Sequence, residues 1–439
     1  MTTRRMLLLG AAGLLPACST IDDLVANRPA PLPGTRLPVL APTPPLEPDP
    51  GLASRAVTLP PPTPVAEWPQ VGGSAAHAPG HVALGGELRE AWRASLGGGG
   101  LFGGAGRITS GPVIAGGVVY AVDAVGTVSA HSLDRGGRLW SFATQPEDDP
   151  TGALGGGCAV EGGVCYVATG MAEILALDAA TGALRWRVRI GAPTRGAPAV
   201  AGGRVFAVTV DSRLVALAAD DGRQLWVHRA SPAVAIPLGL PAPAVADDIV
   251  VAGFASGELV TLRAAEGRLL WTETVAGIAR GTIADIGGIR GAPAIRDGVA
   301  HVAGLASLTL AVDLRSGRRL WERDIGSGSS PAVAGDWAFL IGEPGRVLCV
   351  ERLTGRVRWI HDFAEGLEGR RAPIRAAPLV AGGRVVVPGN DSRALLLDPA
   401  DGSVAGTLRL PGAVLQPMAV ADGRLVMLTE DGTLVAYAG

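Results

Sequence analysis

AlaLeuAspAlaAlaThrGlyAlaLeuArgTrp, residues 176–186, decides the fold, because variants of this stretch recur along the chain. Each copy places a Trp four residues after a turn Gly, as in Gly182 and Trp186. Five further copies keep this spacing, at Gly136 and Trp140, Gly222 and Trp226, Gly267 and Trp271, Gly317 and Trp321, and Gly355 and Trp359. The copy at Gly402 has Gly406 where the Trp is expected. A period of 38 to 50 residues indicates an array of supersecondary units.

Each repeat has the pattern of two β-hairpins. In residues 195–229, the Gly202-Gly203 pair separates two short apolar runs, and an AspAspGly turn separates two more. A Gly pair suits the positive φ angles of a two-residue hairpin turn. Four antiparallel strands repeated radially form the blades of a β-propeller. The sequence therefore predicts an all-β chain folded as a propeller.

The number of blades follows from counting the units. Seven are complete, at residues 108–143, 155–190, 195–229, 240–275, 290–325, 329–363 and 374–410. The eighth, residues 414–438, lacks the strand that carries the Trp, whereas an unpaired strand at residues 91–96 carries Trp92. We therefore predict an eight-bladed β-propeller over residues 67–439, closed by the N-terminal strand in the last blade, which leaves no open edge.

The Trp ladder is expected to be structural. A Trp after a turn can pack its ring between neighbouring blades and bury a large apolar area. We assign this blade-docking role to seven residues: Trp92, Trp140, Trp186, Trp226, Trp271, Trp321 and Trp359.

Residues 1–18 have the features of a secretory signal. Arg4 and Arg5 precede a short apolar run that ends in LeuProAlaCys at residues 15–18. This ending resembles a bacterial lipobox, so Cys18 is the predicted lipidation site, and Ser19 after it fits sorting to the outer membrane. An ordinary signal peptide with an incidental Cys is the alternative. The Arg pair leaves twin-arginine export open.

A Pro-rich segment separates this signal from the repeats. Residues 19–66 carry a Pro every two to four positions between Pro29 and Pro64. Such a composition is typical of extended chain, and we predict a disordered tether that holds the folded body off a membrane.

Composition limits the range of functions. The 439 residues are 48% hydrophobic, with a formal net charge of −2. Nucleic-acid binding requires a basic face, so we expect no nucleic-acid partner.

The repeated AlaLeuAsp-x-x-ThrGly-x-x-x-Trp pattern resembles the tryptophan-docking repeat of quinoprotein (PQQ-type) propellers. A predicted lipoprotein with eight blades and no further domain is similar to the BamB family of the outer-membrane β-barrel assembly machinery. The runs at residues 285–293 and 313–321 look like that family as well. The resemblance implies a non-enzymatic scaffold at the outer membrane, facing the periplasm, that acts as a monomer within a complex. Its implied partners are BamA and, in addition, unfolded outer-membrane proteins.

Quinoprotein chemistry is the competing hypothesis. PQQ-dependent dehydrogenases have adjacent cysteines and a Ca²⁺ site, whereas Cys158, Cys165 and Cys349 are not adjacent here. With a Gly162-Gly163 turn, Cys158 and Cys165 are diagonal neighbours, too far apart for a strain-free disulfide, and we expect buried thiols.

Other chemistry is not indicated by the sequence. His77 and His81 lie in a loop without a helix to align them as metal ligands. We predict no catalytic residue, metal or cofactor, with a PQQ-dependent dehydrogenase or a ligand-sensing propeller as the alternatives.

Uneven connections between repeats indicate where a partner binds. Turns within repeats are tight, whereas the connections at residues 144–156, 230–240, 276–290 and 364–374 are long. Long loops on a rigid scaffold often carry function. In the BamB family, two such connections are implicated in docking BamA, and by position they correspond to residues 235–240 and 285–292. The resemblance thus implies a docking surface at Ile236, Leu238, Leu240, Asp285, Ile289 and Arg290. Arg290 stands where the family has an acidic residue, so the charge pairing differs.

Overall fold

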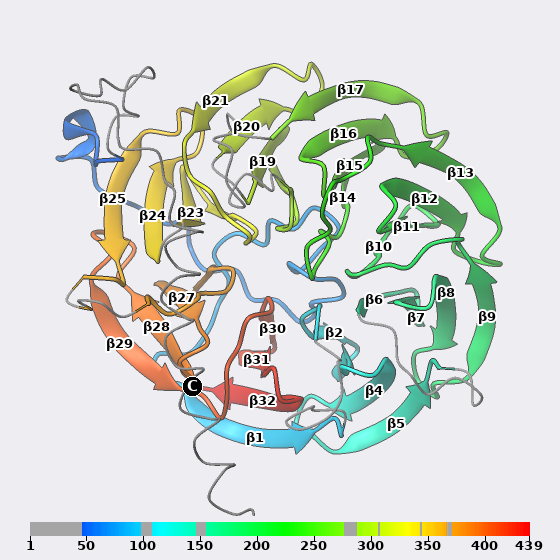
Figure 1. The fold of residues 1–439 in the computed structure, drawn as a ribbon. Helices are drawn as coiled ribbons and strands as arrows, with labels where there is room; N and C mark the ends of the chain where they lie inside the picture. Colours follow the sequence, from blue (N-terminus) through cyan, green and yellow to red (C-terminus); the bar gives the residue numbers. More distant parts are fainter. Residues whose placement is uncertain are drawn as a thin grey trace, which may run out of the picture. The chain divides into compact units, whose positions relative to one another are not determined.

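The computed structural model describes residues 46–97, 108–145, 155–275, 288–305, 308–342, 345–365, 367 and 371–439. The chain divides into two compact units, residues 1–46 and 47–439, and the described strands all lie in the second. Its described residues contain 32 strands in eight four-stranded antiparallel sheets, arranged in a ring as the blades of a β-propeller (Figure 1). The predicted signal, Cys18 and residues 19–45 lie outside the described residues.

Blades 1 to 4 follow one another along the chain. Their strands are β2 (Val113–Ala115), β3 (Val118–Val122), β4 (Thr127–Ser132) and β5 (Arg138–Ala143); β6 (Gly156–Glu161), β7 (Val164–Thr169), β8 (Glu173–Asp178) and β9 (Leu184–Arg189); β10 (Ala199–Ala201), β11 (Arg204–Val208), β12 (Arg213–Ala218) and β13 (Gln224–Arg229); and β14 (Ala244–Ala246), β15 (Ile249–Gly253), β16 (Glu258–Arg263) and β17 (Leu269–Thr274). All four match the predicted units.

Blades 5 to 8 complete the ring. Their strands are β18 (Ala294–Arg296), β19 (Val299–Ala303), β20 (Thr309–Asp313) and β21 (Arg319–Arg323); β22 (Ala332–Ala334), β23 (Trp337–Gly342), β24 (Arg346–Glu351) and β25 (Val357–Asp362); β26 (Leu379–Ala381), β27 (Arg384–Pro388), β28 (Arg393–Leu397) and β29 (Val404–Arg409); and β30 (Ala419–Ala421), β31 (Arg424–Leu428) and β32 (Thr433–Ala438) with β1 (Arg89–Ser95).

The predicted ring closure is confirmed. In blade 8 the strand order is β1-β32-β31-β30, and Trp92 lies opposite Ala436 in the antiparallel pairing of β1 with β32. The N-terminal strand thus supplies the fourth strand that the last repeat lacks.

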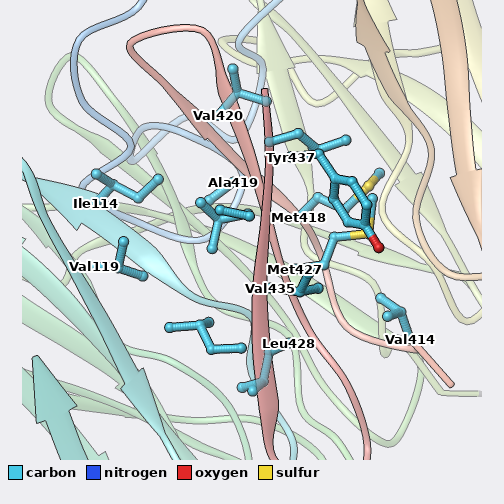
Figure 2. Packing of buried hydrophobic residues seen from close by; sticks show 14 of the residues in the cluster. Ile114, Val119, Val414, Met418, Ala419, Val420, Met427, Leu428, Val435 and Tyr437 are labelled. Carbon is cyan, nitrogen blue, oxygen red and sulfur yellow. The ribbon is translucent and has the colours of Figure 1, made fainter. Parts of the chain in front are cut away.

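Burial follows the position of a strand within its blade. β7 is buried at every position, whereas the outermost strand β9 alternates between exposed and half-buried residues. Continuous apolar runs suit strands covered on both faces. The hydrophobic core therefore lies between blades. Figure 2 shows part of it, where Val420 and Val435 of blade 8 pack in one cluster with Ile114 and Val119 of blade 1.

The Trp ladder joins each blade to the next. In seven seams the indole Nε1–H donates to a main-chain carbonyl of the following blade at 2.7–3.1 Å, from Trp92 to Leu133, Trp140 to Ala179, Trp186 to Ala219, Trp226 to Ala264, Trp271 to Leu314, Trp321 to Arg352, and Trp359 to Pro399. The predicted blade-docking role agrees with these contacts.

The turn Gly of each repeat receives the Trp of the preceding blade. Gly402 has a φ of +77°, and a Cβ there would lie 2.5 Å from Cε3 of Trp359. A side chain at this position would collide with the ring and strain the backbone. The Gly and the Trp of one repeat therefore serve two different seams.

The seam between blades 7 and 8 explains the missing Trp at Gly406. β32 and β1 are not consecutive in the chain, so no Gly-containing turn joins the third and fourth strands of blade 8 to receive an indole. A different bond crosses this seam, from the Tyr437 hydroxyl to the Arg409 carbonyl at 2.9 Å.

Residues 47–66 differ from the predicted disordered tether. They include the 3-10 helix η1 (Pro50–Leu52), in which Leu52 is buried. Arg55 forms ion pairs with Asp336 and Glu351 and lies over the Trp337 ring. The packed chain thus begins at Glu47, before the predicted boundary at residue 67.

Residues 65–82 run around the inside of the ring, and we call this segment the hub thread (Figure 1, pale blue). The thread forms hydrogen bonds of 2.7–3.0 Å to the innermost strands or to their ends. Gln70 bonds through its side chain, and the other residues bond through their main chain. The pairs are Val65 with Asp422, Trp68 with Ile114, Pro69 with Val160, Gln70 with Val200, Ala75 with Val245, Ala76 with Ile295, and Val82 with Val380. These bonds satisfy strand edges that would otherwise face the hub.

Candidate functional site

Alternating strand direction gives the propeller two faces. The turn face holds the turns between the first and second strands and between the third and fourth strands of each blade. The loop face holds the connections between blades and the loops between second and third strands. Of the long predicted connections, residues 230–240 are described in full, and residues 146–154, 276–287, 366 and 368–370 lie outside the described residues.

The connection at residues 230–240 presents apolar side chains on the loop face. Val234 is fully exposed, Ile236 is 39% exposed and Leu238 is 47% exposed. Large exposed apolar residues grouped on one loop are typical of protein-binding sites. Ile236 and Leu238 are therefore available to a partner, as the docking assignment requires.

Leu240 and Ile289 are buried, although the docking assignment places them on the surface. Leu240 is only 5% exposed, and its N–H donates to the Arg195 carbonyl at 3.0 Å. Ile289 is fully buried, and a Cβ on Gly253 would lie 2.5 Å from its side chain. Both side chains belong to the core between blades, so the assignment of these two residues as apolar anchors on the surface is incorrect.

Arg290 lies at the mouth of the hub on the loop face. It lines a cavity of about 90 Å³ together with Gly239, and a Cβ on Gly239 would lie 3.3 Å from the Arg290 Nε. The structure therefore brings Arg290 next to the 230–240 connection. Asp285 lies outside the described residues.

Arg195 is a site residue that the sequence did not single out. It is half-buried beside the same connection, and its guanidinium donates to the Pro237 carbonyl at 3.3 Å. No carboxylate among the described residues pairs with it. Three described features, the exposed Ile236, the exposed Leu238 and the Arg195 cation, thus lie together on the loop face.

The turn face is partly covered by the chain itself. Arg55 binds the turns of blade 6, Pro60 contacts Gly335, and the Glu67 carboxylate accepts from the Gly116 N–H at 3.1 Å. Leu84 contacts the turn at Gly382. The open face, with uneven connections, is therefore the loop face.

The hub leaves little room for a cofactor. Two cavities among the described hub residues measure about 50 and 90 Å³ and share Val71 of the hub thread in their linings. Ligand pockets of cofactor size measure roughly 300–1,000 Å³. The described hub residues therefore do not fit a PQQ-sized group.

The histidines of the sequence analysis have structural contacts. His77 Nδ1 lies 3.0 Å from the Pro293 carbonyl, and His81 Nδ1 lies 2.7 Å from the Pro60 carbonyl. The Gly383 N–H donates to His81 Nε2 at 2.8 Å. No group of three or more His, Cys, Asp or Glu side chains that could hold a metal occurs in the described ranges.

The three cysteines in the described ranges are buried and unbridged. Val160 pairs with Cys165, which makes Cys158 and Cys165 diagonal neighbours as predicted. A hydrogen bond with Cys158 and burial raise the pKa of the Cys165 thiol, and burial raises the pKa of the Cys349 thiol. Raised thiol pKa values disfavour the reactive thiolate.

Comparison with known proteins identifies a family and several relatives. A family model described as "Outer membrane protein assembly factor BamB" matches residues 124–361 and 362–439. The outer membrane protein assembly factor BamB of Salmonella typhimurium is 28% identical, over 74% of this chain and 83% of the relative. The BamB protein of Burkholderia pseudomallei is 27% identical, over 80% of this chain and 88% of that relative.

Solved structures share the fold. The crystal structure of BamB from Moraxella catarrhalis superposes with a TM-score of 0.67 at 19% identity, covering 81% of this chain and 98% of that chain. A europium-containing methanol dehydrogenase superposes with a TM-score of 0.62 at 14% identity, covering 85% of this chain and 90% of that chain. At these identities the likeness concerns the propeller alone. In the part of the chain that the structure describes, no helix has the length and apolar character to cross a bilayer.

Proposed function

The chain belongs to the family of the outer membrane protein assembly factor BamB, and from this premise we propose that it is a non-enzymatic scaffold in outer-membrane β-barrel assembly. Its proposed partner is a BamA-type protein that docks on the loop face. Unfolded outer-membrane proteins are proposed as further clients of the same assembly.

The observation that carries this proposal is the exposed apolar pair on a rigid scaffold. Ile236 and Leu238 project from a connection that Arg195 holds in place from two sides, through its carbonyl to the Leu240 N–H and through its guanidinium to the Pro237 carbonyl. Interface hot spots are often apolar or Arg side chains on a preorganised surface.

The scaffold role is also supported by what fills the hub. Quinohemoprotein alcohol dehydrogenases share the propeller, but here the hub thread runs around the inside of the ring, and the two described hub cavities are far below cofactor size. We expect no dye-linked alcohol oxidation after incubation with PQQ and Ca²⁺. Turnover in that assay would overturn the non-enzymatic role.

A lipid anchor at Cys18 would hold the protein at the outer membrane. The following residues up to 46 would then serve as the tether, because the packed chain begins at Glu47. Cys18→Ser should release the protein from the membrane fraction. Retention of this variant on membranes would contradict lipidation at Cys18.

The partner itself can be tested in the native membrane. Affinity purification of the full-length protein after mild detergent extraction should recover a BamA-type protein. Its absence from repeated preparations, with the propeller intact, would contradict the scaffold role.

A further inference from the structure

The hub thread forms hydrogen bonds to seven of the eight blades in the described part of the chain. In order around the ring it bonds to blade 8, blades 1 to 5, and blade 7. Within the described residues, no main-chain hydrogen bond joins the thread to β22 of blade 6. Val333, at the centre of β22, corresponds in the repeat to Val200 and Val245, whose N–H groups both bond to the thread. The pattern of contacts therefore has a gap at blade 6.

A cavity of about 50 Å³ occupies this gap. The hub thread lines it with Trp68, Val71 and His77, and the innermost strands of blades 6 and 7 line it with residues 331–333 and 378–380. The thread and the two blades thus all line the cavity, together with Ala292 of the repeat before them and Met418 of the repeat after them.

One buried polar atom of the lining residues has no partner in the described part of the protein, and one further ring nitrogen is available as an acceptor. Trp68 is buried, and its indole Nε1–H finds no acceptor. His77 is also buried, and because its Nδ1 faces the Pro293 carbonyl, that nitrogen carries the proton and Nε2 is an acceptor. Burial lowers the pKa of His77 to about 4, so the ring is neutral near pH 7 and Nε2 keeps its lone pair. Buried polar atoms without partners are rare in folded proteins.

These features define the chemistry of a ligand. It must offer an acceptor to the Trp68 indole and a donor to His77, and it must be uncharged because most of the lining is apolar, including Val71, Leu379 and Met418. One water needs roughly 10–15 Å³ of such space, so the cavity of about 50 Å³ has room for a small molecule only.

We propose that this hub cavity is a binding site for a small neutral molecule with both an acceptor and a donor, such as a primary carboxamide. Its carbonyl oxygen accepts from the Trp68 Nε1–H, and its N–H donates to His77 Nε2. The proposal is independent of the docking role, because the cavity lies in the hub and not on the 230–240 connection.

Indole N–H signals of the full chain, labelled with ¹⁵N-Trp, provide the test. Trp68→Phe identifies the Trp68 signal by its loss. Titration with acetamide should then shift the Trp68 signal saturably in the unaltered protein and leave the blade-docking Trp signals in place. An unchanged Trp68 signal, or a non-saturable drift of all indole signals together, would overturn the proposal.

Histidine variants sharpen the result. His77→Phe should weaken acetamide binding at least several-fold, whereas His228→Phe on β13, outside the cavity lining, should leave it unchanged. Equal binding by both variants would contradict the assigned role of His77. If His77→Phe does not fold, the Trp68 signal of the unaltered protein still shows whether acetamide binds in the cavity.

Discussion

The turn face and the loop face of this propeller are built from the same repeats but differ in regularity. On the turn face, seven indoles bond to the next blade, and the N-terminal segment packs over several turns. On the loop face, the connections differ in length, and one of them exposes Ile236 and Leu238. The difference indicates that one face holds the ring together while the other is free to vary and to bind.

This comparison predicts that changes on the two faces have separable effects. Changes to the turn face and the hub should alter the free energy of unfolding and leave partner affinity unchanged in the folded molecules. Changes to the loop connection at residues 230–240 should do the reverse.

The largest expected effect is the loss of one seam. Trp359→Ala removes a buried ring and its bond to the Pro399 carbonyl at 2.8 Å, and leaves a space against Gly402. We expect a loss of about 3–5 kcal/mol in the free energy of unfolding, measured by urea denaturation. A loss below about 1 kcal/mol would contradict the importance of the ladder.

The second-largest expected effect is a fall in the free energy of unfolding at acidic pH. Burial lowers the pKa of His77 and of His301 from 6.5 to about 4 in the folded protein. Between these values the unfolded chain binds more protons, so the free energy of unfolding is highest above pH 6.5 and falls as the pH drops toward 4. Between pH 6.5 and pH 5 we expect roughly 2 kcal/mol of loss for each histidine. Urea denaturation at several pH values, with His301→Phe flattening part of the slope, provides the check.

The hub thread should contribute a smaller amount at each contact. The Gln70 side chain donates to the Val200 carbonyl at 2.7 Å and accepts from the Val200 N–H at 3.0 Å. Gln70→Ala leaves both groups without these partners, and we expect a loss of about 1–3 kcal/mol. Gln145→Ala is the matched control, because this half-buried side chain also donates to a carbonyl, that of Val125, but lies away from the hub, and we expect it to change stability less. Equal stability of the two variants would show that the thread is not part of the cooperative fold.

The sequence predicted the outer ring well, for a physical reason. The Trp ladder and the closing strand β1 follow from a local pattern that repeats in register, with Trp92 supplying the piece that the last unit lacks. A contact set by one short motif can be read wherever the motif recurs.

The hub thread and the details of the docking surface could not be predicted in the same way. Residues 47–82 are rich in Pro and Gly and have no hydrophobic period, and their bonds are to strand edges far away in the sequence. The burial of Leu240 and Ile289 depends on which way a loop side chain points, which their residue type does not decide. Arg195 gave no signal, because its proximity to Pro237 appears only once the blades are folded.

The smallest effect should come from the loop-face cation. Arg195→Ala removes a guanidinium with no carboxylate partner among the described residues, together with a single 3.3 Å bond to the Pro237 carbonyl. We expect partner affinity to fall by a few fold, as for a partly exposed charge, and the fall to shrink at high salt. An effect independent of salt would show that Arg195 only positions the loop.

Docking of a BamA-type partner on the loop face can be tested by one affinity measurement on two matched variants. Leu238→Asp alters a side chain that is 47% exposed on the loop face, and Leu353→Asp alters one that is 51% exposed in a turn of the opposite face. Binding of each variant to the periplasmic domains of the partner can be measured by calorimetry. We expect at least a tenfold loss of affinity for Leu238→Asp, about 1.4 kcal/mol, and an unchanged affinity for Leu353→Asp. Equal affinities for the two variants, with both folded, would rule out docking on the loop face.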